Sequence, residues 1–321
     1  MKNLKSAIGL GVLSWLNAPA RLKNDLNSIF LSTYQSITNF KNLPKMKLLK
    51  YILPILVFTL LLNSCSKDDD DTIKPEHHST FVLVHGAWQA SFVWNKVKTS
   101  LEAQGNKVIL VELAGHGNDQ TPVSQVTFNG YVKQVTDVIE GLNTPVVLVG
   151  HSLGGAIVTQ AATKLPQRIE KLIYVAGFIP KSGSSVFDYS AMDAGTLIPT
   201  ALEFSADGST VTIAKPETNL REIFCKDGSA EDNKLLVDNL RPEPVVAAGT
   251  PLNYSKDIYN AIANKYYIYT TQDKAISYDF QQQMVSEAKI TNTYKIDAGH
   301  SPFLSKPNEL VEIFNTIIKK Y

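Results

Sequence analysis

A regular alternation of short apolar runs with longer helical stretches is the feature of this chain that most constrains its fold. Four runs come first: FVLVHG from Phe81, VILVEL from Val108, VVLVGHS from Val146 and KLIYVAGF from Lys171. Helical patterns separate them at residues 92–104, 128–142 and 155–165. Such alternation predicts an α/β fold, a mostly parallel central sheet with helices on both faces. The runs are continuously apolar, as expected for strands covered on both sides.

The alternation stops after Pro180 and resumes only beyond residue 256. The second half then shows KYYIYTTQD, a helical pattern at 278–288, the run TNTYKID and a closing helical pattern at 307–320. The polar stretch between, about 181–256, is an insertion between two halves of one sheet. Because ligands bind outside the carboxyl ends of such strands, we expect this insertion to form a cap over the site.

Composition supports one packed domain over residues 79–321 and excludes some functions. The 321 residues are 44% hydrophobic and 9% aromatic, enough for a sizeable core. Residues 1–64 hold eight Lys or Arg and one Asp, a charge of +7, so the remainder carries −6 of the total of +1. A mildly acidic domain without a basic stripe offers no surface for nucleic acid. The two cysteines, Cys65 and Cys225, do not have the spacing of a metal site, and we expect no metal and no cofactor.

The segment from Met46 has the pattern of a signal peptide. It reads MKLLKYILPILVFTLLLNSCSKDDDD, with two lysines before an apolar run at 51–62. This run is short of the roughly 20 residues that span a bilayer as a helix, and Pro54 interrupts it. We therefore interpret residues 46–64 as a cleaved signal peptide. Residues 1–45 precede it as an N-terminal extension to which we assign no function.

Cys65 follows Leu62-Asn63-Ser64, which resembles the lipobox of bacterial lipoproteins. The resemblance implies that Cys65 is acylated and anchors the chain to a membrane; the alternative is ordinary secretory cleavage beside an unrelated cysteine. Residues 65–78 include four successive aspartates and predict a solvated acidic tether. The expected location is the bacterial cell envelope, lipid-anchored, at the outer membrane or the cell surface.

Ser152 is the predicted nucleophile. It is the serine of Gly150-His151-Ser152-Leu153-Gly154, a GxSxG motif that follows an apolar run and precedes a helical pattern rich in small residues. Strand, motif and helix in this order predict a sharp turn with the serine at its apex, where neighbouring glycines avoid clashes and the helix N-terminus favours negative charge. A serine in an ordinary turn is the plainer alternative.

A serine hydroxyl needs a base, and His300 is the predicted one. It lies in the loop after the last predicted strand, the position at which this order of motifs places the base. Asp273, at the end of KYYIYTTQD, is the predicted acid that orients His300. Asp297, three residues before His300, is its competitor, and Asp279 at a predicted helix start is better explained as a cap.

Catalysis also needs donors for the negative charge that develops on the carbonyl oxygen. The backbone N–H of Leu153, directly after the nucleophile, is one predicted donor. The second is the N–H of Ala87, in the loop His85-Gly86-Ala87-Trp88 after the first predicted strand.

At these motifs the sequence resembles a known family. FVLVHGAW, GHSLGGAIVTQ, YIYTTQD and AGHSPFLSKP are similar to the branch of α/β-hydrolases that contains plant methyl-ester hydrolases, hydroxynitrile lyases and bacterial relatives. The resemblance runs from Phe81 to the C-terminus and implies an α/β-hydrolase fold. It implies the same triad and oxyanion donors by matching positions. It also implies that Cys225, within a segment like the family's cap, is a packed residue and not a nucleophile.

Two positions depart from the lyase members of that branch. They carry a threonine where this chain has Gly86 and a lysine where it has Ser301. Because a cyanide leaving group needs that positive charge, we expect ester hydrolysis and not lyase chemistry.

The sequence therefore predicts a serine esterase that acts on a small apolar ester. Lyase or acyltransferase chemistry on the same triad, or a tethered binding protein without turnover, are the alternatives. Several cap side chains are candidates for an apolar wall, although core packing is the more ordinary role for several of them: Phe187, Tyr189, Met192, Leu197, Ile198 and Phe204. The sequence does not indicate an oligomeric state.

Overall fold

A computed structural model describes residues 78–320 of the chain. The predicted extension 1–45, the signal peptide 46–64, the anchor Cys65 and almost all of the tether lie outside the described residues. Within the described residues, no helix is both long and apolar enough to cross a membrane.

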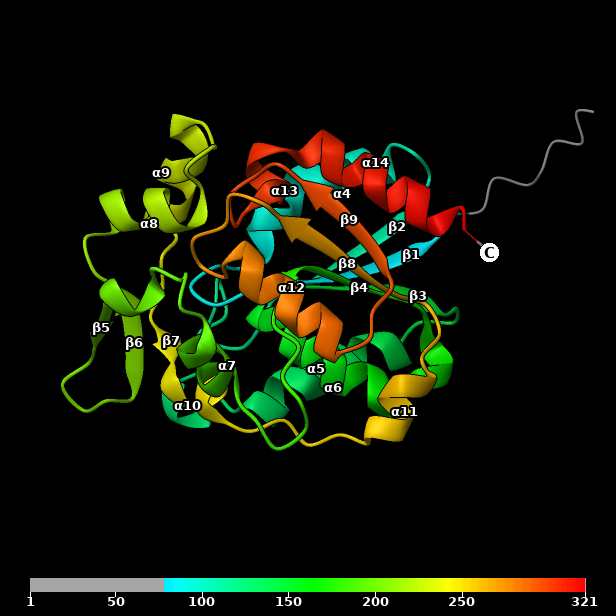
Figure 1. Cartoon of the computed structure of the whole chain (residues 1–321), viewed down its shortest axis with the longest axis horizontal. Coiled ribbons are helices and arrows are strands. Elements are labelled where there is room, and N and C mark those ends of the chain that lie inside the picture. The colour runs from blue at the N-terminus through cyan, green and yellow to red at the C-terminus, as the bar shows by residue number, and fades with distance from the viewer. Residues whose placement is uncertain (1–77, 321) are drawn as a thin grey trace, which may run out of the picture. The chain divides into compact units, whose positions relative to one another are not determined.

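Six parallel strands form the central sheet (Figure 1). Their order is β2-β1-β3-β4-β8-β9. Their bounds are β1 (Thr80–Val84), β2 (Lys107–Val111), β3 (Val146–Ser152), β4 (Ile169–Gly177), β8 (Lys265–Thr270) and β9 (Asn292–Ile296). All seven residues of β3 are buried, as the continuous apolar run predicts for a strand covered on both faces. The predicted α/β fold class is confirmed.

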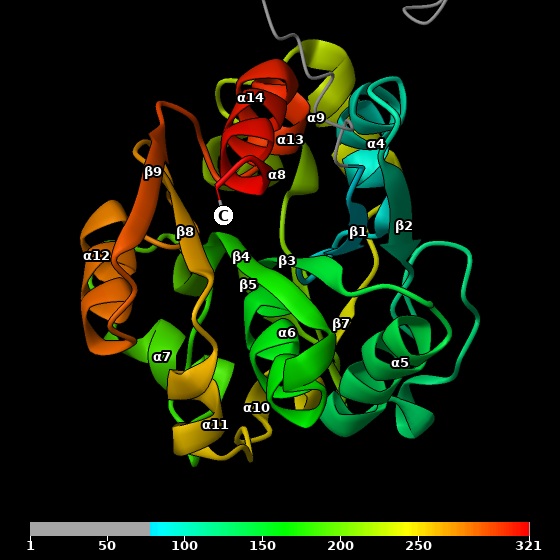
Figure 2. The same ribbon diagram turned by 90° about the vertical axis from the view of Figure 1, so that its right-hand side faces the viewer.

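Helices cover both faces of the sheet (Figure 2). One face carries α4 (Asn95–Glu102), α13 (Pro302–Ser305) and α14 (Pro307–Ile318); the other carries α5 (Phe128–Glu140), α6 (Leu153–Lys164), α11 (Lys256–Ala261) and α12 (Tyr278–Glu287). Successive residues of β1 enter different cores: Phe81 and Leu83 pack with α4 and α14, whereas Val82 and Val84 pack with α5 and α6. The alternation of side chains along a strand thus builds two cores from one run.

The chain between β4 and α11 forms a cap of short elements. The helices are α7 (Val186–Met192), α8 (Pro216–Phe224), α9 (Ala230–Asp238) and α10 (Val245–Gly249), with a 3-10 turn at Ile198–Thr200. Three strands, β5 (Leu202–Phe204), β6 (Thr210–Ile213) and β7 (Glu243–Pro244), make an antiparallel sheet in the order β5-β6-β7. Ser185 and Ser229 begin α7 and α9 with capping boxes, each accepting from the backbone N–H three residues on. Further 3-10 turns of the main domain lie at Ser91–Trp94, Val123–Gln125 and Pro166–Arg168.

Candidate active site

Ser152 ends β3 at the first residue before α6, in a backbone conformation that side chains rarely adopt. Its φ is 53° and its ψ is −124°. Such angles are costly for any residue with a side chain, so the surrounding packing has to impose them. The neighbouring glycines make that packing possible: a Cβ on Gly154 would lie 2.6 Å from the carbonyl oxygen of His85. The strand, the turn and the helix therefore hold the Ser152 hydroxyl at the carboxyl edge of the sheet.

His300 and Asp273 form a buried pair at the same edge. Nδ1 of His300, in the loop after β9, lies 2.7 Å from Oδ2 of Asp273, three residues after β8. Because an ionised carboxylate only accepts hydrogen bonds, Nδ1 carries the proton. Nε2 of His300 is buried and has no hydrogen-bond partner among the described residues. This nitrogen is therefore left with an unshared electron pair, which is what a general base requires.

The carboxylate of Asp273 is held by several other donors. Oδ1 accepts from two backbone N–H groups, and Oδ2 accepts from two further side chains besides His300. These donors are Ala275 N (2.8 Å), Ile276 N (2.9 Å), Thr270 Oγ1 (2.8 Å) and Gln281 Nε2 (3.2 Å). Together these hydrogen bonds fix the position of the Asp273 carboxyl group beside His300.

Asp297 and Asp279, the rival carboxylates, are placed elsewhere. Asp297 is exposed and accepts from Thr271 Oγ1 at 2.7 Å and Gln272 Nε2 at 2.9 Å, hydrogen bonds that lower its pKa. Asp279 is exposed in the first turn of α12. Of the three aspartates considered, the structure brings Asp273 to His300.

A second histidine positions the loop of His300. His151, beside Ser152, donates from Nε2 to the carbonyl oxygen of His300 at 2.8 Å, and the two rings lie 4.5 Å apart. Burial, followed by the charge of His300, lowers the pKa of His151 well below its usual value, so it stays neutral. The sequence analysis treated His151 only as part of the motif and missed this contact, because it joins residues 149 positions apart.

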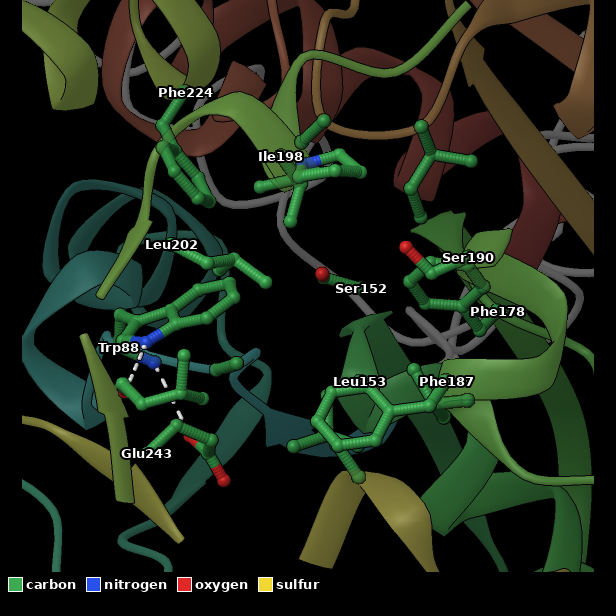
Figure 3. Close-up of a pocket in the computed structure, with 17 residues that line it drawn as sticks. Trp88, Ser152, Leu153, Phe178, Phe187, Ser190, Ile198, Leu202, Phe224 and Glu243 are labelled. Atoms are coloured by element: carbon green, nitrogen blue, oxygen red, sulfur yellow. Dashed lines mark hydrogen bonds between the residues drawn. The ribbon is translucent and has the colours of Figure 1, made fainter. Parts of the chain in front are cut away.

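Ser152, Ala87 and Leu153 line one pocket (Figure 3). It encloses about 610 Å³ of atom-free space, its open mouth included. The wall is mostly apolar: Trp88, Phe178, Val186, Phe187, Ile198, Pro199, Leu202, Val211, Phe224, Ala248, Ala275 and Ile276. Ser152, Ser190 and Glu243 are the polar residues of the lining. Phe224 also packs against His300, with ring centroids 5.5 Å apart, so the histidine borders the pocket that holds Ser152.

The cap supplies much of this wall, though not through all the expected residues. Phe187 and Ile198 line the pocket. Tyr189 is buried in the core against Phe280 instead, and Met192, Leu197 and Phe204 are exposed. Trp88, Phe224 and Glu243 were not predicted as pocket residues, because the sequence of a loop or of a cap does not reveal which side chains face inward.

Comparison with known proteins places this site in a family. The chain matches the model of the alpha/beta hydrolase family over residues 81–313. It belongs to the alpha/beta hydrolase family. Methylesterase 7 of Arabidopsis thaliana is 30% identical over 254 residues, which cover 75% of this chain and 96% of that protein. An alpha-hydroxynitrile lyase of the same plant is 30% identical over 260 residues, 77% of this chain and 98% of the lyase.

Solved structures agree with this family assignment. The crystal structure of a methylesterase from Arabidopsis has a TM-score of 0.65 and 27% identity, covering 76% of this chain and all of that one. The predicted α/β-hydrolase fold is confirmed, and the methylesterases agree with the predicted enzyme class, a carboxylic ester hydrolase.

In this alpha/beta hydrolase, Gly86 is packed against the motif of the nucleophile. A Cβ at Gly86 would lie 2.7 Å from the Cβ of Ser152 and 3.0 Å from Nδ1 of His151. A threonine at this position therefore does not fit without a shift of the loop or of the turn. Ser301 is fully buried, and its Oγ accepts from Gln89 Nε2 at 3.2 Å. Neither position has room ready for the larger side chain of the lyases.

Cys225 of this hydrolase lies in the cap, directly after α8, and is buried. Burial, followed by the charges of Asp227 and Asp232, raises the pKa of its thiol to about 12. The thiol is thus kept protonated and unreactive. Among the described residues, no group of three or more His, Cys, Asp or Glu side chains is placed to bind a metal ion.

Proposed function

We propose that residues 79–321 hydrolyse a small carboxylic ester through an acyl-enzyme on Ser152, with His300 as general base and Asp273 as its orienting acid. The observation that carries this proposal is the state of His300. Its Nδ1 is bound to Asp273, its Nε2 is buried without a hydrogen-bond partner among the described residues, and its ring packs against Phe224, which lines the same pocket as Ser152. An imidazole held by an aspartate with its Nε2 free is what the base of a serine hydrolase triad requires.

The reaction follows from these positions. Nε2 of His300 takes the proton of Ser152 as Oγ attacks the ester carbonyl carbon. The backbone N–H groups of Ala87 and Leu153 stabilise the oxyanion. When the intermediate collapses, the bond to the alcohol breaks and His300 returns the proton to that alcohol. Water then repeats the sequence, releasing the acid and restoring Ser152, while Asp273 remains ionised throughout.

Hydrolysis is favoured over lyase chemistry by Gly86 and Ser301. Family likeness does not separate the two, since a methylesterase and a hydroxynitrile lyase are equally identical to this chain. Gly86, however, has no space for a threonine, and Ser301 supplies no positive charge for a cyanide leaving group.

The apolar wall suits an ester with an apolar acyl group. Methylesterase 7 and other relatives of this chain in Arabidopsis thaliana are named methylesterases, and we extend that substrate class to this chain: a methyl ester of a small apolar acid. The methyl leaving group requires little space beside Ser152.

Ser152→Ala tests the proposal with p-nitrophenyl acetate and butyrate. We expect turnover to fall by at least about 10⁴-fold, because the nucleophile of the triad is lost. Ser190→Ala, which removes another pocket hydroxyl, is the matched comparison and should retain activity within about 10-fold, a loss far below that for a triad member. Wild-type enzyme without ester turnover, or a Ser152→Ala enzyme as active as wild type, would refute the proposal. Release of cyanide from a cyanohydrin by the wild type would support the lyase alternative.

We also propose that the enzyme is anchored in a bacterial cell envelope by lipid on Cys65. The lipobox-like sequence before Cys65 supports this, together with the polar stretch that follows it. Cys65→Ser should move the enzyme from the membrane fraction to the soluble fraction and abolish labelling by an alkyne-bearing fatty acid. Unchanged fractionation and no labelling of the wild type would contradict it.

A further inference from the structure

The residue after the proposed oxyanion donor Ala87 has an unfavourable backbone conformation. Trp88 has a φ of +59°, in the left-handed region that favours glycine and is strained for a bulky side chain. Such a conformation persists only where contacts impose it. The Ala87 N–H belongs to the preceding peptide unit, Gly86–Ala87. Contacts that hold the Ala87–Trp88 peptide therefore limit the direction of the Ala87 N–H through the two backbone dihedral angles of Ala87.

Two hydrogen bonds hold Trp88, and both come from the cap (Figure 3). Its backbone N–H donates to Oε2 of Glu243 at 3.2 Å, and its indole Nε1 donates to the carbonyl oxygen of Val211 at 2.9 Å. Val211 and Glu243 are paired directly across β6 and β7. The small sheet of the cap therefore presents both acceptors to Trp88 from one rigid pair.

Glu243 is itself fixed by a buried charge partner. Oε2 lies 2.9 Å from Nε2 of His116, whose Nδ1 lies 3.1 Å from the carbonyl oxygen of Ala114. Both ring nitrogens thus face acceptors, so His116 carries two protons and a positive charge. Burial on its own lowers the pKa of His116, but the charge and hydrogen bond of Glu243 outweigh it and raise the pKa. The pair is almost fully buried, so its geometry is well constrained.

We propose that Glu243 is a positioning residue: its carboxylate, paired with His116, holds the Trp88 N–H and thereby directs the Ala87 N–H at the developing oxyanion. This inference rests on the proposed function. The cap, on this view, completes the oxyanion site as well as covering the pocket. A single oxygen of Glu243, Oε2, serves both His116 and Trp88.

Three substitutions of Glu243 separate its possible roles. Glu243→Ala removes the acceptor, Glu243→Met removes it while keeping the length of a buried side chain, and Glu243→Gln keeps one oxygen for Trp88. Glu112→Ala is the matched control. Glu112 accepts from the backbone N–H of Ser91 at 2.9 Å and of Asn118 at 2.8 Å, so it fixes the same loop without touching Ala87 or Trp88.

The first measurement is kcat and KM for p-nitrophenyl butyrate. We expect kcat of the Ala and Met variants to fall about 10- to 100-fold with KM within about 3-fold, less than the complete loss of an oxyanion donor costs. Glu243→Gln and Glu112→Ala should stay within about 5-fold of wild type, since each leaves Trp88 an acceptor. The inhibition constant of a trifluoromethyl ketone, whose adduct with Ser152 bears an oxyanion, should rise by the same factor by which kcat/KM falls.

The second measurement is independent of turnover. Amide hydrogen exchange of residues 85–90 should accelerate in Glu243→Met and remain slow in Glu243→Gln. Wild-type-like kcat in Glu243→Met, an equal loss in Glu112→Ala, or unchanged exchange of this segment would overturn the proposal. Absence of turnover in the wild type would instead refute the proposed function, and the exchange experiment would still decide whether Glu243 holds Trp88.

Discussion

Asp273→Asn is the substitution whose outcome the structure defines most closely. In asparagine an NH2 group replaces one carboxylate oxygen of Asp273, so the volume of the buried side chain is nearly preserved. What changes is the hydrogen-bonding character of one position, which becomes a donor. The question is therefore which of the two carboxylate positions receives the amide nitrogen.

The surrounding donors decide that orientation. Oδ1 accepts from the backbone N–H groups of Ala275 and Ile276, which cannot become acceptors. The amide oxygen has to remain there, so the nitrogen takes the place of Oδ2, 2.7 Å from Nδ1 of His300. It then donates to Nδ1, and the proton of the neutral imidazole moves to Nε2. In the proposed mechanism Nε2 accepts the proton of Ser152, so the substitution should remove the base without removing the histidine.

The expected loss is about 10⁴-fold in kcat, the effect of the wrong tautomer in a serine triad, or about 5 kcal/mol of transition-state stabilisation. The assay is hydrolysis of p-nitrophenyl butyrate at pH 7.5. Nitrogen-15 NMR of the histidine side chains reports the tautomer independently. We expect the His300 proton on Nδ1 in the wild type and on Nε2 in Asp273→Asn.

Asp297→Asn is the control, because Asp297 is exposed and bonded to Thr271 and Gln272. It should retain kcat within about 2-fold, as expected for a surface change away from the site. The reasoning fails if Asp273→Asn keeps more than about a tenth of the wild-type kcat, since the wrong tautomer costs far more. It also fails if the two variants lose equal activity.

Two further outcomes follow from the packing around the nucleophile and from buried histidines. Gly86→Ala should lower kcat/KM about 10- to 100-fold, because the new Cβ would lie 2.7 Å from the Cβ of Ser152 and the loop or the turn has to move. A kcat/KM equal to that of the wild type, measured by steady-state kinetics, would contradict this. Acid should destabilise the fold as the pH falls from ~6.5 to ~5. Burial, followed by the charge of His116, lowers the pKa of His85 in the folded protein to about 3. In this pH range the unfolded chain therefore binds a proton at His85 that the folded chain excludes. The free energy of unfolding should fall by about 1.4 kcal/mol per pH unit for each such proton. His151, whose pKa is also lowered, adds a second proton. The pKa of His116 is raised, so His116 does not reduce the stability as the pH falls. Urea midpoints that do not change from pH 7 to 5 would exclude this effect.

The sheet and the proposed triad could be predicted because their signals are local. Each strand is a continuous apolar run, and GxSxG defines its own turn within five residues. His300 and Asp273 required only the order of motifs along the chain, since parallel strands bring their carboxyl ends to one edge. The order of motifs does not decide between Asp273 and Asp297 as the partner of His300. The structure does, because Nδ1 of His300 lies 2.7 Å from Oδ2 of Asp273.

The wall of the pocket could not be predicted in the same way. The cap consists of short elements with weak periodicity, and β7 has only two residues. Glu243 stands in an unremarkable Pro-rich segment, and its partner Trp88 is 155 positions away. No pattern in either segment indicates the other. A contact of this kind becomes visible only when the fold has brought the two segments together.

This difference also bears on how the enzyme's chemistry and specificity can vary. Ser152 ends β3, and His300 and Asp273 lie in the loops after β9 and β8. The contact between His300 and Asp273 does not involve the cap. Phe187 and Ile198 of the cap line the pocket, so their substitution should change substrate preference while leaving the contact between His300 and Asp273 intact. Glu243 is the exception, because it reaches from β7 to the loop of the oxyanion donor. Substitution there should reduce turnover of every ester alike, which would distinguish a positioning residue from one that selects substrates.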